Sequence, residues 1–125
     1  LTDGAAADPL AHEHEAADES YSVAIVAQGK TAILSVAPAR AGNNSITVAL
    51  RGQGWTDITP LEVTASFQQA AAGIEPITRT LRSIGPGLYE YAGPEITIPG
   101  EWTVAVGVLI NDFERISFRA QIPVR

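Results

Sequence analysis

The sequence predicts an all-β protein, an immunoglobulin-like antiparallel β-sandwich of seven to eight strands. Several short segments alternate apolar and polar residues, as strands with one buried face do. Clusters of Gly, Pro, Asn and Asp, which favour turns, separate these segments at short intervals. Long amphipathic helical patterns do not occur between the segments, and this argues against a doubly wound α/β fold.

The chain divides into an acidic leader, residues 1–20, and a sandwich domain, residues 21–125. The leader holds six of the fourteen acidic residues and no Lys or Arg, so it carries the whole net charge of −6. Because it has almost no large apolar side chains, we expect a flexible linker. A short helix capped by Asp8, with Pro9 in its first turn, is the alternative.

Four segments show the strongest strand pattern, each with a stripe of apolar residues on one face. They are SITVALR at 45–51, LEVTASFQ at 61–68, WTVAVGVLI at 102–110 and ERISFRAQIPV at 114–124. The predicted inward residues of the second segment include Leu61, Val63 and Phe67. Pro123 predicts that the last strand lies at a sheet edge, because proline cannot donate to a strand ladder.

Four further segments predict weaker strands: YSVAIVA at 21–27, TAILSVA at 31–37, PITRTLRS at 76–83 and GLYEYA at 87–92. The first is expected as an extra edge strand. In the third, Arg79 falls on the same face as the apolar residues Ile77 and Leu81. A bulge or an edge position would allow Arg79 to reach solvent.

Composition restricts the classes of function. A chain of 125 residues makes one ordinary domain. The absence of cysteine excludes disulfides and thiolate metal sites. Without a basic stripe, nucleic acid is not expected as a partner. No segment has the length and hydropathy of a membrane span, and Leu1 in place of Met suggests a processed chain or a fragment of a longer protein.

We expect no enzymatic activity. Both histidines lie in the leader, so the sandwich cannot form a Ser-His-Asp triad, and no G-x-S-x-G motif occurs. Two pairs of carboxylates, Glu90 with Glu95 and Asp112 with Glu114, lie near turns. A glycosidase needs two carboxyl groups across a cleft, whereas these positions favour solvated surface charges.

The leader contains one candidate metal site, formed by His12 and His14. In an extended chain the two imidazoles project to the same side and could share a metal ion, whereas in a helix they diverge. Imidazole with nearby carboxylates suits Cu(II), Ni(II) or Zn(II) better than Cu(I), which prefers sulfur ligands. The leader therefore either binds one of these divalent ions through His12 and His14 or is a linker without a cofactor.

Four aromatic residues could form a sugar-binding platform. Trp102 is in phase with a valine stripe and is expected in the core, while Trp55 follows a glycine turn and is the better candidate for exposure. Tyr89 and Tyr91 share one strand face. At least one of them is expected to pack inside with its hydroxyl bonded to the backbone.

Three segments resemble the C-terminal extracytoplasmic domain of copper-resistance D (CopD) family membrane proteins, which is similar to YtkA-like and FixH-like immunoglobulin-type modules. The segments lie within residues 35–50, 87–108 and 113–124. Three features carry the resemblance: a turn with Pro38, Gly42 and Asn43, a strand with Gly87 and Tyr89, and a strand opened by Pro99, Gly100 and Trp102. It spans about residues 21–125.

The resemblance implies a periplasmic or extracellular accessory domain of a membrane protein in copper transport or copper resistance. The leader would be the tether from the membrane, and the partner would be the parent's own membrane domain or a periplasmic protein. The matched features are turn and core residues, so they bring no metal ligand with them. The alternative is a structural or protein–protein interaction module that binds no metal.

Overall fold

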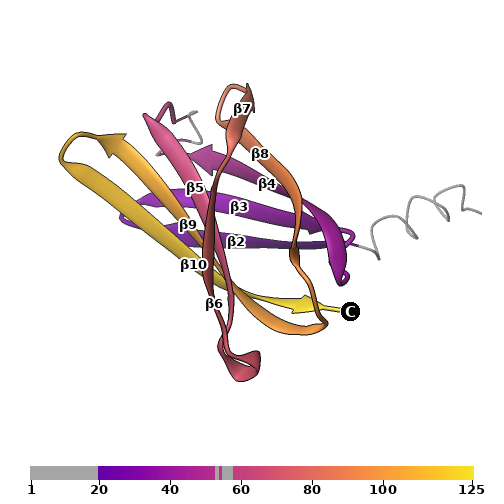
Figure 1. Ribbon diagram of the computed structural model, residues 1–125. Helices are drawn as coiled ribbons and strands as arrows, with labels where there is room; N and C mark the ends of the chain where they lie inside the picture. The colour runs from indigo at the N-terminus through magenta and orange to yellow at the C-terminus, as the bar shows by residue number, and fades with distance from the viewer. Residues whose placement is uncertain (1–19, 53, 55–57) are drawn as a thin grey trace, which may run out of the picture.

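The computed structural model describes residues 20–52, 54 and 58–125. This part of the chain forms nine strands and one 3-10 helix (Figure 1). The strands are β2 (Tyr21–Ala27), β3 (Lys30–Ala37), β4 (Gly42–Arg51), β5 (Glu62–Gln69), β6 (Ile74–Thr80), β7 (Arg82–Gly85), β8 (Leu88–Ile96), β9 (Gly100–Asn111) and β10 (Glu114–Val124), and the helix is η3 (Ala70–Ala72). The prediction for the leader falls outside the described residues.

The strands form two antiparallel sheets, which confirms the predicted all-β sandwich. One sheet has the order β2-β3-β4-β8-β7 and the other the order β10-β9-β5-β6. The strands β3-β4-β8-β7 correspond to the A-B-E-D sheet of an immunoglobulin domain, and β10-β9-β5-β6 corresponds to its G-F-C sheet with one added strand. Strand β2 lies outside this correspondence, at the free edge of the five-stranded sheet.

The core lies between the two sheets, as the alternating pattern predicts. Trp102, Val104, Val106 and Val108 of β9 all face inward and are buried, and the Trp102 indole donates a hydrogen bond of 2.9 Å to the Ile98 carbonyl. The other large buried side chains come from both sheets: Phe67, Phe118, Leu34, Ile46 and Leu50. Burial of these side chains is the main favourable contribution to folding.

The predicted inward position of Leu61 is wrong. Leu61 precedes β5, and the residue is 65% exposed. Its amide donates to the Leu109 carbonyl at 2.8 Å, so its backbone is fixed beside β9. The alternation of buried and exposed residues therefore begins at Val63, two residues later than the sequence pattern predicts.

The predicted strand at 76–83 divides into two strands that belong to different sheets. β6 pairs with β5 in the four-stranded sheet, and β7 pairs with β8 in the five-stranded sheet. Leu81 lies between them, is buried, and donates its amide to the Val63 carbonyl at 2.8 Å. This crossing gives nine strands where seven to eight are expected. Figure 1 shows β6 and β7 following one another along one side of the sandwich.

The predicted edge positions are confirmed. β6 is an edge strand, and the Arg79 side chain is 45% exposed. β10, which contains Pro123, is the opposite edge of the same sheet. β2 forms the extra edge strand that the sequence suggests.

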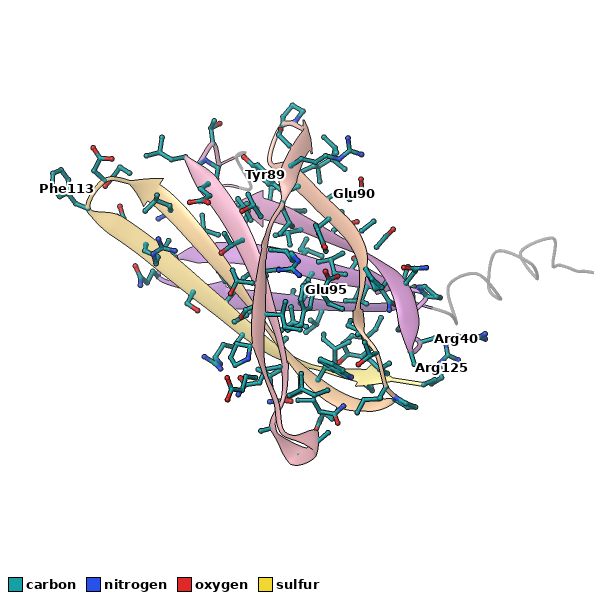
Figure 2. All side chains as sticks on the ribbon, in the orientation of Figure 1. Arg40, Tyr89, Glu90, Glu95, Phe113 and Arg125 are labelled. Atoms are coloured by element: carbon teal, nitrogen blue, oxygen red, sulfur yellow. The ribbon has the colours of Figure 1, made fainter. Side chains whose placement is uncertain are left out.

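The buried side chain of Asn44 holds the β3–β4 connection, at the end of the sandwich where the C-terminal residue Arg125 lies. The Asn44 Oδ1 accepts from the Ala39 amide at 2.8 Å, and Nδ2 donates to the carbonyls of Arg40 at 2.7 Å and Gly42 at 3.1 Å. Two backbone hydrogen bonds join Ala39 and Ala41 to Arg125. Figure 2 shows Arg40 and Arg125 close together at this end.

Candidate functional site

The predicted metal ligands, His12 and His14, lie outside the described residues. Within residues 20–52, 54 and 58–125, no three His, Cys, Asp or Glu side chains gather in a group that could hold a metal ion. The same part of the chain encloses no pocket, and none of its helices has the length and apolar character of a membrane span. In this part of the chain, the surface and the edges of the sandwich are the places where a binding site can lie.

Glu90 and Glu95, one of the predicted carboxylate pairs, do not face each other. Both belong to β8, but Glu90 points to the outer face of the sheet and Glu95 to the inner side. Glu90 pairs with Arg82 of the neighbouring strand at 3.2 Å. The predicted solvated position of Glu95 is wrong, because only 10% of its side chain is exposed.

Glu95 belongs to a three-residue cluster that joins the two sheets. The Arg79 Nε donates to Glu95 Oε2 at 2.9 Å, and the Tyr91 hydroxyl donates to the same oxygen at 2.6 Å. Arg79 comes from β6 and the other two residues from β8. Figure 2 shows Glu95 directed into the space between these strands. Gly93 permits the arrangement, since a Cβ there would lie 2.6 Å from the Tyr91 hydroxyl.

The contacts in the Arg79–Tyr91–Glu95 cluster change the pKa of each member. Burial by itself raises the pKa of Glu95, but hydrogen bonds from Tyr91, from the backbone and from Arg79 lower the net pKa below its usual value. The pKa of Tyr91 is raised mainly by its hydrogen bond to Glu95 and, to a smaller extent, by burial. The hydrogen bond to Glu95 also raises the pKa of Arg79. These groups satisfy one another, so the cluster serves as a link between the sheets.

Three of the four aromatic candidates for a sugar platform can be placed. Trp102 is buried, as predicted, and Tyr89 is 9% exposed. Tyr91 also faces inward, with its ring centroid 6.4 Å from that of Phe67. Its hydroxyl binds the Glu95 carboxylate rather than the backbone, which corrects the predicted partner. Trp55 lies outside the described residues.

The four sheet edges differ in the side chains they carry. An exposed strand edge offers unpaired N–H and C=O groups, and proteins usually protect such edges with charges, proline or bulges. β6, β7 and β10 carry such residues, namely Glu75, Pro76, Arg79, Arg82, Arg115, Arg119 and Pro123. β2, with the sequence YSVAIVA, has neither a charge nor a proline. Of the described edges, β2 is thus the one that lacks protection.

The hairpin between β2 and β3 determines which backbone groups of β2 face outward. Gln28 and Gly29 form its two-residue turn and both have positive φ, which is typical of a type I′ turn. Such a turn makes Ala27 and Lys30 a hydrogen-bonded pair, so alternate residues from Ala27 backward bond to β3. The N–H and C=O groups of Ser22, Ala24 and Val26 consequently point to the free edge.

The side chains of β2 make this edge apolar on both faces. Tyr21, Val23, Ile25 and Ala27 point inward and pack against the core while keeping part of their surface exposed. On the outer face, Ala24 continues a row of apolar side chains that runs through Ile33, Ala49 and Leu88. Val26 is 71% exposed. The sequence signal for this site is the uncharged run itself.

A comparison of the chain with protein-family models, curated proteins and solved structures finds no match.

Proposed function

We propose that this chain is a non-enzymatic interaction module, and that a protein partner binds by adding an extended strand to β2. The uncharged, proline-free edge of β2 is the observation that carries this proposal. In strand addition the main-chain hydrogen bonds provide affinity and alternate side chains provide specificity. The three outward-facing residues of β2 supply these main-chain groups, and its half-exposed apolar side chains favour an apolar partner strand.

The setting that we propose is the periplasmic or extracellular face of a membrane, as an accessory domain of a copper transport or resistance protein. The resemblance to copper-resistance D family domains supports this setting. In such a protein the partner strand would belong to the parent's membrane domain or to a periplasmic protein. The neutral sandwich suits a binding mode that depends on backbone hydrogen bonds rather than on charge.

A labelled peptide tests strand addition directly. We expect a peptide with the sequence YSVAIVA, flanked by lysines for solubility, to bind the whole chain and to raise its fluorescence anisotropy. Two controls remove the hydrogen bonds without removing apolar surface: the same peptide N-methylated at alternate residues, and the chain variant Ala24→Pro. Both should weaken binding at least about tenfold. Equal binding in all three experiments would refute strand addition at β2.

Cu(II) binding by the leader is a second candidate function, favoured by the spacing of His12 and His14. We expect the whole chain to bind Cu(II) and the double variant His12→Ala/His14→Ala to lose at least about tenfold in affinity. Isothermal titration calorimetry at pH 7 measures both. A variant with Glu13→Gln and Glu15→Gln separates the imidazoles from the carboxylates. Unchanged affinity in the double histidine variant would exclude the metal site.

A further inference from the structure

The edge of β2 is chemically complementary to itself. In an antiparallel pair, like charges that lie opposite each other are destabilising, and two copies of β10 paired about their central residue would place Arg119 opposite Arg119. Two copies of β2 bring no charges together. Its residues are mostly β-branched or small, and such residues pack well between neighbouring strands. A second copy of β2 therefore satisfies the same requirements as the partner strand proposed above.

The outward groups of β2 fix the register of such a pair. Ala24 is the central residue of the strand, so a two-fold axis through it gives the longest overlap. Ala24 then faces Ala24 of the second copy, and Ser22 faces Val26 in both directions. All three residues have N–H and C=O groups directed to the free edge, so each pair exchanges both of its hydrogen bonds. The apolar row on the outer face continues across the axis.

The arginines of the neighbouring strand β10 do not face this pair of β2 strands. β10 contacts β2 from the other sheet, but the two strands do not pair. The arginines of β10, Arg115 and Arg119, are exposed and alternate with buried residues that face the core. They therefore point to the outer face of the four-stranded sheet, away from β2.

We infer that two copies of this chain associate through β2 in an antiparallel pair centred on Ala24, which joins their five-stranded sheets into one continuous sheet. This inference rests on the proposed function, because it names a second copy as a strand that β2 accepts. An isologous pair of this kind closes on itself and leaves no β2 edge exposed. It removes the aggregation risk of an unprotected edge in the described fold.

Charge reversal at Ala24 tests the inference on the whole chain. The variants Ala24→Glu and Ala24→Lys are at an exposed position, so both should fold. Sedimentation velocity over a concentration series should show a dimer for the unmodified chain and, for each variant alone, association at least about fivefold weaker. An equimolar mixture of the two variants should recover dimerisation, because opposite charges then face each other.

Each result is decisive for one of the two proposals. Recovery in the mixture establishes the antiparallel pair at Ala24. A chain that stays monomeric, or a dimer that neither charge variant weakens, overturns the inference while peptide binding to β2 still supports strand addition. Loss in both variants without recovery in the mixture also overturns the pairing centred on Ala24. Circular dichroism of each variant shows whether the sandwich has folded.

Discussion

The variant Asn44→Ala should lose about 3 kcal/mol of unfolding free energy, measured by urea denaturation. Asn44 is 3% exposed, and its side chain makes three hydrogen bonds to the backbone of the β3–β4 connection. Alanine removes the acceptor of the buried Ala39 amide and the donor to two carbonyls, and an unsatisfied buried polar group costs about 1 to 3 kcal/mol. This loss is a large share of the stability of a small domain.

The neighbouring residue supplies the matched control. Asn43 has the same side chain but is exposed on the surface. Asn43→Ala should change the unfolding free energy by less than about 0.5 kcal/mol. If the two variants destabilise the protein equally, the hydrogen bonds of Asn44 do not hold the connection.

The variant Glu95→Gln should lose about 2 kcal/mol, because hydrogen bonds to a charged, largely buried carboxylate contribute more than neutral ones. Arg79 and Tyr91 both donate to one Glu95 oxygen, and the cluster connects the two sheets. Glu90→Gln on the same strand is the control, since its pair with Arg82 is solvent-exposed. An exposed pair contributes less than about 1 kcal/mol. Equal losses in the two variants would show that the cluster adds no stability.

The stabilisation from Glu95 should depend on pH. The folded state lowers the pKa of Glu95, so the ionised carboxylate stabilises the fold fully above the usual pKa of about 4.3. This stabilisation is lost as the pH falls through the pKa that Glu95 has in the folded protein. Because the folded state raises the pKa of Tyr91, its contribution is present below about pH 10 and is lost at higher pH. The difference in stability between the unmodified chain and Glu95→Gln should therefore be largest between these limits.

Alternation and turn composition were sufficient to predict the sandwich. The period-two pattern places the inward residues of β9 and β10 correctly, and the edge position of β10 follows from Pro123. The division at Leu81 was not predictable from pattern alone. A single run with one apolar stripe looks the same whether it stays in one sheet or crosses to the other, and the crossing depends on tertiary contacts such as the hydrogen bond from Leu81 to Val63.

The environment of Glu95 was also missed, for a related reason. A glutamate beside a turn usually lies in water, and its partner Arg79 is sixteen residues away in the sequence. The signals were present but separate: an arginine on an apolar face, a tyrosine four residues before the glutamate, and a glycine between them. Only the sheet arrangement brings these residues together.

The candidate binding edge was partly predictable. The run YSVAIVA indicates an edge strand, and the lack of charge can be read from the sequence. Which backbone groups face outward depends on the hairpin register, which positive φ at both Gln28 and Gly29 fixes.

Residue-resolved amide hydrogen exchange tests strand addition at β2 most directly. At a chain concentration low enough to give the monomer, saturation with the YSVAIVA peptide should slow exchange at least about tenfold at the amides of Ser22, Ala24 and Val26, because strand addition forms new hydrogen bonds to them. Exchange at the amides of Val23 and Ile25, already bonded to β3, should change much less. Bound peptide with no slowing at Ser22, Ala24 and Val26 would contradict the proposal that β2 is the binding element.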